Sequence, residues 1–296
     1  MDPLLLVDGH NLLYRAAYGT PAEVCSRDTP RRDITTQFMF FALLRKAISA
    51  NLTDWPEIIV VFDGEHGSAG RLAVDPEYKA NRDTSESARR PLEALPDITA
   101  GLDLYSVAWI EQDDAEADDV IATLTASRGG RDVVIISTDQ DFYQLLAWPE
   151  PERGAVRILN TARYAGRRLL DPAHVHDRYG VAPDRYPDLR ALAGDPSDNI
   201  PGVTGVGITT ARRLLADGLG LEDLPASGRL TGARGKAIQE SWTHVLTWRS
   251  MIRMRSDVPL PRAPTGEPTT TLPRAADIID KLGLWDRPRT SGGNGQ

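Results

Sequence analysis

The sequence predicts an α/β protein with a mostly parallel sheet flanked by helices. Three short apolar runs, at residues 4–8, 58–63 and 133–139, each end in an aspartate. Continuous apolar runs of this length are typical of strands buried on both faces of a parallel sheet. A helical pattern with a broad apolar face, residues 35–50, separates the first two runs. Strand, helix and strand joined by short turns form the unit from which such sheets are built.

The composition indicates an ordinary soluble globular protein. The chain has 296 residues, 41% of them hydrophobic and 26% charged, which is enough to bury the core of at least one large domain. No apolar run could cross a membrane, and the first residues lack the features of a signal peptide. The single cysteine, Cys25, excludes an internal disulfide framework. We therefore expect a cytoplasmic protein.

The net charge of −8 gives no direct support for an anionic partner. If nine of the 42 acidic residues were gathered in one metal pocket, 33 would remain against 34 lysines and arginines. The rest of the surface would then be nearly neutral, which permits local basic patches without predicting them.

Acidic side chains gather at the expected carboxyl ends of the strands. Asp8, Asp63 and Asp139 each end an apolar run, and ligands of open parallel sheets bind beyond that edge. One Asp-Gly pair by itself predicts no more than a turn. A further acidic run, residues 116–119, opens a helix whose apolar residues recur at helical spacing. So many carboxylates at the ends of core elements would repel one another unless cations lay between them, so the sequence predicts a divalent-metal site.

A long polar segment, residues 66–106, follows the second strand directly. It includes Tyr78, Lys79 and Arg82, then a charged, serine-rich stretch, before a helical pattern resumes. A long insertion beside a strand that carries site residues is typically a mobile functional segment. The composition also allows a disordered surface loop.

A glycine-rich loop, residues 194–207, precedes a short amphipathic helix at about residues 209–216. Glycines at a helix start leave backbone N–H groups free to meet a phosphate. Loops of this type grip a nucleic-acid backbone without reading its bases. Two acids in the loop would place it beside the metal site. The residues concerned are Asp195, Asp198, Gly205, Gly207, Arg212 and Arg213.

The remaining segments predict one further strand, several helices and two segments without regular structure. We expect a strand near the sheet edge at residues 155–159, a helix from Pro172 to Tyr179, a closing helix at about 242–254, a linker at 261–270, a short helix at 277–284 and disorder at 291–296.

Six motifs together resemble those of the 5′-nuclease superfamily, which includes bacterial 5′–3′ exonucleases, flap endonucleases and the N-terminal nuclease region of DNA polymerase I. The resemblance covers roughly residues 4–261 and ends where a polymerase region would begin, so we expect a stand-alone enzyme. The motifs are Val7-Asp8-Gly9, Phe62-Asp63-Gly64, Tyr78-Lys79-x-Asn81-Arg82, Glu116-Ala117-Asp118-Asp119, Thr138-Asp139-x-Asp141 and Gly194-Asp195-x-Ser197-Asp198-Asn199-Ile200-Pro201-Gly202-Val203.

The resemblance implies a PIN-like sheet with helices on both faces, a helical arch and a helix–two-turn–helix DNA-binding subdomain. The implied domains are a nuclease domain at residues 1–190 with the arch at about 66–106, a DNA-binding region at 191–262 and a C-terminal extension at 263–296.

The resemblance also implies a set of site residues. It implies two or three Mg²⁺ or Mn²⁺ ions, the first held by Asp8, Asp63, Glu116 and Asp118. The second would be surrounded by Asp119, Asp139, Asp141, Asp195 and Asp198. Catalytic roles would fall to Lys79, Arg82, Asp139 and Asp141. A potassium ion would be bound by the backbone carbonyls of Val203 and Val206. Contacts with DNA would come from Tyr78, Lys79, Arg82, Gly205, Gly207, Arg212 and Arg213, although Tyr78 could equally pack in the core.

The implied function is that of a structure-specific 5′ nuclease, which hydrolyses DNA by two-metal catalysis in replication and repair. Its substrates would be DNA with a 5′ flap, a nick or a free 5′ end, including RNA-primed DNA. We expect a monomer that is associated with the bacterial nucleoid and not with a membrane. One alternative is a non-catalytic, structure-specific DNA-binding module. Another is a PIN-domain ribonuclease, which shares the acidic sheet edge but lacks the arch and the glycine-rich loop.

Two features depart from the family pattern. Thr209 stands where the family usually has a lysine, so one phosphate contact would be weaker or would come from Arg212 or Arg213. Asp113 and Asp114 make the approach to Glu116 more acidic than is usual. They would either support the metal ligands or hold an additional ion.

Overall fold

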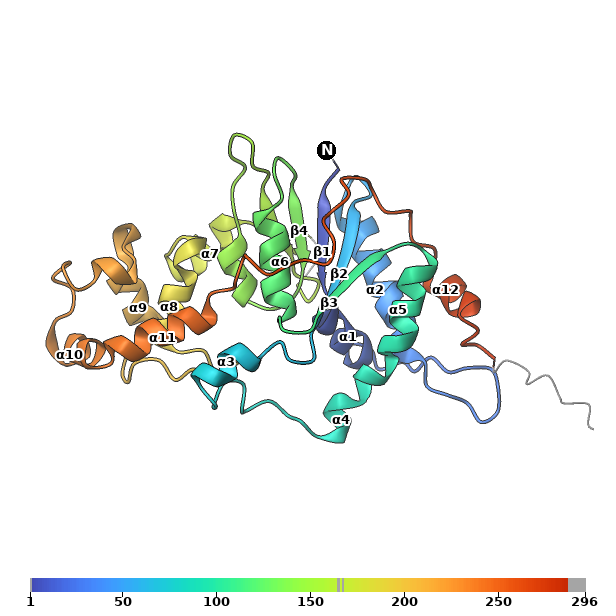
Figure 1. The fold of residues 1–296 in the computed structure, drawn as a ribbon, viewed down its shortest axis with the longest axis horizontal. Coiled ribbons are helices and arrows are strands. Elements are labelled where there is room, and N and C mark those ends of the chain that lie inside the picture. The colour runs from blue at the N-terminus through green and yellow to red at the C-terminus, as the bar shows by residue number, and fades with distance from the viewer. Residues whose placement is uncertain (1, 164–165, 167, 287–296) are drawn as a thin grey trace, which may run out of the picture.

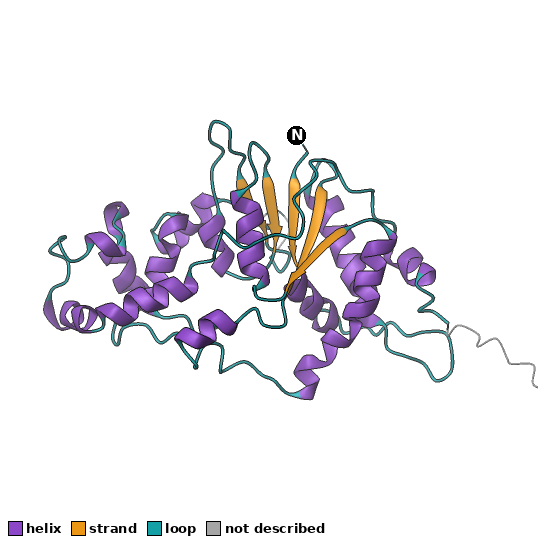
Figure 2. Ribbon diagram, viewed as in Figure 1, coloured by secondary structure: helices purple, strands orange, loops and turns teal. Residues whose placement is uncertain are grey.

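A computed structural model describes residues 2–163, 166 and 168–286, so the expected disorder at 291–296 lies outside the described residues. Its centre is a six-stranded sheet with the order β3-β2-β1-β4-β5-β6 (Figure 1, Figure 2). Neighbouring strands are parallel except β6, which runs antiparallel to β5. The strands are β1 Leu4–Asp8, β2 Glu57–Asp63, β3 Ala108–Gln112, β4 Val133–Ile136, β5 Val156–Leu159 and β6 Leu169–Leu170.

This sheet confirms the predicted fold class and the four predicted strands β1, β2, β4 and β5. The sequence does not predict β3 and β6. The five residues of β3 include Glu111 and Gln112, so this edge strand lacks the continuous apolar run of a central one. β6 is only two residues long, which is too short for any periodicity to show.

The central strands send alternate side chains into two separate cores. In β1, Leu4 and Leu6 belong to one hydrophobic cluster, whereas Leu5 and Val7 belong to the other, and all four are fully buried. The first cluster is covered by α6 Ala117–Ala126. The second is covered by α1 Gly9–Tyr18, α2 Thr35–Asn51, α5 Leu95–Leu104 and α12 Ala275–Lys281.

Most helices begin and end close to their predicted bounds. The clearest case is α7 Pro172–Tyr179, which starts after the N-cap residue Asp171 and stops at Gly180, where φ is 69°. α2, α6 and α12 also follow the predicted patterns, and the closing helix is α11 Trp242–Ile252. α1 is not predicted, because it starts at the glycine that directly follows β1.

The segment after β2 runs along the carboxyl edge of the sheet (Figure 1). We call residues 66–94 the arch segment; it contains α3 Ala69–Val74, α4 Glu86–Arg89 and the 3₁₀ helix η1 Arg90–Ala94. Its middle is hydrogen-bonded to the glycine-rich loop: the N–H of Lys79 donates to the Asp198 carbonyl at 3.1 Å, and Asn81 Nδ2 donates to the Pro196 carbonyl at 2.7 Å. These contacts argue against the surface-loop interpretation.

A group of helices extends the molecule beyond β6 (Figure 1). It consists of α7, α8 Tyr186–Ala193, α9 Ile208–Leu214, α10 Gly232–Glu240 and α11, with the 3₁₀ helices η2 Asp141–Leu145, η3 Pro183–Arg185, η4 Ala216–Gly218 and η5 Leu221–Asp223. We call α8 to α11 the helical region. From α11 the chain returns to β2, where the N–H of Thr269 donates to the Pro56 carbonyl at 3.1 Å. Within the described residues, no helix is both long and apolar enough to span a membrane.

Candidate active site

A cleft of about 750 Å³ opens at the carboxyl ends of the strands. Four of the nine predicted metal-ligand carboxylates line it: Asp8, Asp63, Asp118 and Asp139. Lys79 and Arg82 of the arch segment line it too. The sheet therefore brings together acids that are up to 131 residues apart in the chain, between positions 8 and 139.

Asp8 ends β1 and caps α1. Its Oδ1 accepts the N–H of Asn11 at 3.0 Å, and its Oδ2 accepts the Ser137 hydroxyl at 2.8 Å. Burial raises the pKa of Asp8 to about 7, and the charges of Asp63 and Asp139 add to the rise, which the two hydrogen bonds only partly offset. No lysine or arginine in the described part of the chain forms an ion pair with Asp8, so its ionised form lacks a countercharge.

Asp63 ends β2 and joins it to the start of α6. Its Oδ1 accepts the N–H of Ala117 at 2.8 Å, and its Oδ2 lies 3.3 Å from His10 Nδ1. The backbone N–H of Asp63 donates to the same His10 nitrogen at 3.0 Å. In that bond Nδ1 is the acceptor.

Asp118, in the first turn of α6, interacts with the other cleft carboxylates. Burial raises the pKa of Asp118 well above its usual value, and Asp139, Asp8 and Asp63 raise it further, whereas Lys79 lowers it. Asp139 follows β4, and its Oδ1 accepts the N–H of Asp141 at 2.9 Å. The cleft thus concentrates negative charge on carboxylates that, among the described residues, form no ion pair with a lysine or arginine.

A second group of carboxylates, Asp141, Asp195 and Asp198, lies toward the helical region. Burial raises the pKa of Asp141 well above its usual value, with Asp139, Asp195 and Asp198 adding to the rise. Burial would also raise the pKa of Asp195, but Arg190 holds it below the usual value, with contacts of 3.1 and 2.8 Å to the two carboxylate oxygens. Asp139 interacts with both groups.

Glu116, at the N-cap position of α6, is already neutralised by cations. Its Oε1 accepts from Lys79 Nζ at 2.9 Å, and its Oε2 accepts from Arg71 Nη1 at 3.0 Å. Burial disfavours the ionised form, but Lys79, Arg71 and a hydrogen bond from Ser68 outweigh it and lower the pKa of Glu116 to about 2. Lys79 is therefore held within reach of the cleft by a carboxylate.

The structure separates the roles of Tyr78 and Arg82. Tyr78 is only 3% exposed, and its hydroxyl contacts Glu116 Oε2 and Asp198 Oδ2, both at 3.2 Å. A buried ring offers no face to a DNA base, so the geometry favours the core role for Tyr78. The Arg82 side chain is 53% exposed, with Nη2 at 3.2 Å from Asp198 Oδ1, and can turn toward a ligand.

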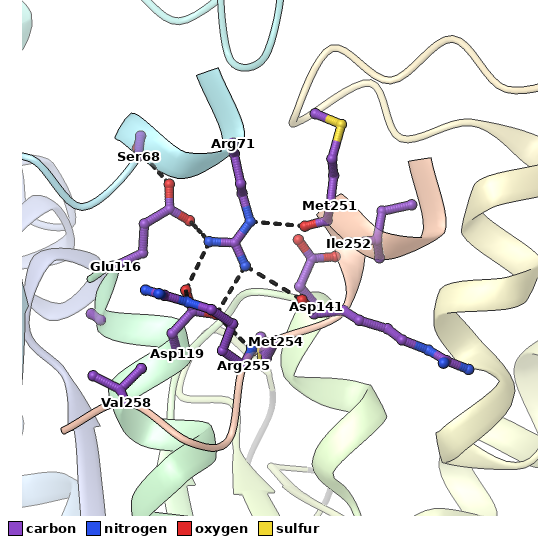
Figure 3. A network of polar contacts seen from close by, with 12 residues as sticks. Ser68, Arg71, Glu116, Asp119, Asp141, Met251, Ile252, Met254, Arg255 and Val258 are labelled. Carbon is purple, nitrogen blue, oxygen red and sulfur yellow. Dashed lines mark hydrogen bonds and ion pairs between the residues drawn. The ribbon is translucent and has the colours of Figure 1, made fainter. Parts of the chain in front are cut away.

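Asp119 is bound by two arginines, Arg71 and Arg255, and each of them donates to both of its oxygens (Figure 3). Arg71 Nη1 and Nη2 donate to Oδ2 and Oδ1, each at 2.9 Å. Arg255 donates its backbone N–H to Oδ1 at 2.8 Å and its Nε to Oδ2 at 3.0 Å. Asp119 is fully buried and is absent from the cleft lining. This geometry argues against its predicted role as a metal ligand.

The glycine-rich loop lies between α8 and α9. Gly207 directly precedes α9, and Arg212 and Arg213 on that helix are exposed, as a phosphate-binding surface requires. The Val203 carbonyl accepts the N–H of Val206 at 2.9 Å. The potassium site assigned to these two carbonyls stays a prediction.

One wall of the cleft is formed by α1, which the sequence does not predict. His10, Asn11, Tyr14, Arg15 and Tyr18 of α1 all line the cleft. Among the described residues, the Nε and Nη1 atoms of Arg15 are buried without a hydrogen-bond partner. The signal that could have revealed this wall is the spacing of Tyr14 and Tyr18, which are four residues apart and so lie on one face of a helix.

Asp113 and Asp114 do not line the cleft. Asp113 is 3.0 Å from His66 Nδ1, and these side chains are 71% and 65% exposed. With Glu65 they form a surface group whose potential ligand atoms lie within 4.8 Å of one another. Asp114 accepts from Gln112 Nε2 at 3.1 Å. Neither aspartate therefore joins the acids of the cleft.

Two domain families match the chain in succession. The 5′–3′ exonuclease N-terminal, resolvase-like domain matches residues 3–180, and the 5′–3′ exonuclease C-terminal domain, with a SAM fold, matches residues 181–271. The predicted boundary between domains lies at 190 and stays a prediction.

Similar proteins include both short and long chains. A 5′–3′ exonuclease of Streptomyces coelicolor is 34% identical over 295 residues, which is 94% of this chain and 94% of that one. A thermostable DNA polymerase I of Thermus thermophilus is 35% identical over 261 residues, 87% of this chain, and the match spans only 29% of the polymerase.

Among solved structures, the bacteriophage T5 flap endonuclease in a pseudo-enzyme-product complex with DNA and metal ions has the same fold. The TM-score is 0.64 at 22% identity, and the match covers 84% of this chain and 88% of that one. Together with domain matches over residues 3–271, these similarities show that the chain belongs to the 5′–3′ exonuclease family of nucleases.

Proposed function

We propose that this protein is a structure-specific 5′ nuclease that hydrolyses DNA phosphodiesters with the help of two divalent cations. The observation that carries the proposal is the cluster of four carboxylates that line the cleft: Asp8, Asp63, Asp118 and Asp139. Among the described residues none of them forms an ion pair with a lysine or arginine, and Asp8 and Asp118 have raised pKa values. Burying like charges together is costly unless cations are bound between them. A stable fold has little other reason to keep such a cluster.

The donor set fits Mg²⁺ or Mn²⁺, because both prefer carboxylate oxygen and Mg²⁺ keeps several waters. The first ion would be held by Asp8, Asp63, Glu116 and Asp118, and the second by Asp139, Asp141, Asp195 and Asp198, some of them through water. Such ions, when bound, supply an activated water and stabilise charge on the scissile phosphate. In the hairpin between α8 and α9, the carbonyls of Val203 and Val206 would hold a potassium ion.

Lys79 and Arg82 would bind the phosphate from the side of the arch segment. Each is already held at the cleft by a carboxylate, Lys79 by Glu116 and Arg82 by Asp198. Cations that bind those carboxylates would release the two side chains. Preorganised positive groups of this kind stabilise negative charge that develops in the transition state.

The DNA would lie across both parts of the molecule. Gly205, Gly207, Arg212 and Arg213 would hold the duplex by its backbone, which gives affinity without sequence preference. Tyr14 and Arg15 also line the cleft and would contact the nucleotides beside the cut. Substrates with a 5′ flap, a nick or a free 5′ end, RNA-primed DNA included, would thread or bend at the arch segment. We propose that the protein acts as a monomer near the nucleoid, in replication and repair.

The test is cleavage of a labelled 5′-flap duplex in Mg²⁺, in Mn²⁺ and in EDTA. We expect product in both metals and none in EDTA. Asp118→Asn should abolish the product, whereas Asp114→Asn, an acid outside the cleft, should not. Tight binding of the flap duplex without product in either metal would favour the alternative, a non-catalytic DNA-binding module.

A further inference from the structure

The side chain of Arg71 connects three elements that are distant in the sequence (Figure 3). It projects from α3, at the base of the arch segment, and is only 13% exposed. Its Nε donates to the Met251 carbonyl in the last turn of α11 at 2.8 Å, and its Nη1 and Nη2 bind Glu116 and Asp119 in α6. One guanidinium group therefore fixes the arch segment, the helical region and α6 relative to one another.

Asp119 is the centre of these contacts. Its carboxylate receives four hydrogen bonds, two from the Arg71 fork and two from Arg255. Arg255 lies on the chain that leaves α11, so both arginines join α6 to the same neighbouring region. A bidentate pair of this kind sets direction as well as distance, which a lysine could not do.

The position of Asp119 also determines where Asp118 points. Consecutive residues of an α-helix project about 100° apart around the axis. With Asp119 held on the side of α3 and α11, Asp118 is turned into the cleft, which it lines together with Asp139 and Asp8. Glu116, at the N-cap position of the same helix, is held by the same guanidinium group of Arg71.

We propose that Arg71 and Asp119 form a clamp that positions Glu116 and Asp118 for catalysis, and that Asp119 acts through this clamp and not as a metal ligand. The proposal rests on the proposed nuclease function, because it assigns the clamp to the alignment of that site. The clamp closes only when the arch segment and the helical region are both docked on α6. It thereby makes the geometry of the cleft depend on the two parts that would hold the DNA.

The experiment compares Arg71→Met, Arg71→Lys, Asp119→Asn and the Arg71→Met/Asp119→Asn double variant with the wild type. Arg274→Met is the matched control, because it breaks an exposed pair with Asp277 in which the arginine side chain is 79% exposed. Three quantities are measured: the single-turnover rate on saturating 5′-flap duplex with Mn²⁺, the affinity for that duplex in EDTA, and amide hydrogen exchange of residues 69–74 and 117–121 without metal or DNA.

We expect Arg71→Met and Asp119→Asn each to slow the single-turnover step about 10²-fold, because a displacement of about 1 Å in a positioned group can cost that much. Affinity for DNA in EDTA should be unchanged. Hydrogen exchange should rise in both segments together. The double variant should be no slower than Arg71→Met, and Arg71→Lys should not restore the rate.

Three results would overturn the clamp: effects of the single variants that multiply in the double variant, full activity of Arg71→Lys, or unchanged exchange at residues 117–121 in Arg71→Met. A wild-type protein that cleaves no DNA would instead refute the proposed function. In that case the exchange measurements alone decide whether Arg71 and Asp119 hold α6 to α3. Arg274→Met should match the wild type in all three measurements.

Discussion

Buried acids at the two ends of the sheet have opposite environments and opposite pKa shifts. Glu57 starts β2 at the amino end, and Asp8 ends β1 at the carboxyl end; they are 4% and 7% exposed. Glu57 is bound by Arg131 at 2.6 Å and by the backbone N–H groups of Thr265 and Gly266. Burial would raise the pKa of Glu57, but these hydrogen bonds lower it, whereas the pKa of Asp8 rises to about 7.

This difference shows what each end of the sheet is for. Glu57 contributes to stability, since its partners tie β2 to Arg131, just before β4, and to the returning chain at Thr265. Asp8 and its neighbours repel one another, which lowers stability in the absence of bound cations. A protein keeps such repulsion where it serves a function. Glu57 therefore stabilises the fold, whereas Asp8 belongs to the functional site.

The largest expected effect comes from neutralising an acid of the cleft. Asp139→Asn should reduce cleavage of a 5′-flap duplex about 10³-fold or more, because metal ions supply several kcal/mol of transition-state stabilisation. Binding of the duplex in EDTA should persist, and the melting temperature should not fall. Single-turnover kinetics, a binding titration and a thermal melt measure the three. Near-normal turnover would remove Asp139 from the proposed site.

The next test concerns the cation that faces these acids. Lys79→Ala should lower the single-turnover rate about 10²-fold, because the ammonium group would stabilise charge on the phosphate in the transition state. Lys46→Ala, which removes an exposed lysine of α2, is the control and should leave the single-turnover rate unchanged. A wild-type rate in Lys79→Ala would mean that Lys79 serves only to pair with Glu116.

At the amino end, the same kind of change should affect stability and leave activity intact. Glu57→Gln should lower the free energy of unfolding by about 2 kcal/mol, since hydrogen bonds to a buried charge are lost and Arg131 is left unpaired. Urea unfolding measures this loss, and the cleavage rate per folded molecule should not change. Glu111→Gln, an exposed acid of β3, is the control. Equal stability of both variants would contradict the division between the two ends.

The sequence predicts the central part of this fold because buried parallel strands are continuous apolar runs. β1, β2 and β4 therefore stand out, together with the aspartates that follow them. β3 is missed because Ile110 is the only buried residue among its five, so the strand lacks a continuous apolar run. α1 is missed because no turn separates it from β1.

For the site, spacing identifies acids but not their partners. Asp118 and Asp119 look alike in the sequence, yet Asp118 faces the cleft while Asp119 is held by Arg71 and Arg255. Those arginines are 48 and 136 residues away, and no local periodicity connects positions so far apart. The difference between the two neighbours depends on tertiary packing alone.

The smallest expected effect is a dependence of stability on pH in the metal-free protein. The pKa of Asp8 rises from 3.8 to about 7 on folding, so the folded state binds this proton more tightly than the unfolded state. The stability that the proton contributes is present at low pH and is lost as the pH rises through 7, by about 1.4 kcal/mol between about pH 6 and pH 8.

Urea unfolding in EDTA, compared between the wild type and Asp8→Asn, measures this contribution as a difference. Asp118 and Asp141, whose pKa values are also raised, lower the stability of both proteins as the pH rises. Their contributions therefore largely cancel when the two proteins are compared. Asp8→Asn should therefore lose less stability than the wild type toward pH 8. Mg²⁺ should restore stability to the wild type at pH 8, because cations between the carboxylates replace the protons. Parallel pH profiles for the two proteins would mean that Asp8 is as well compensated as Glu57, and the contrast between the two ends of the sheet would disappear.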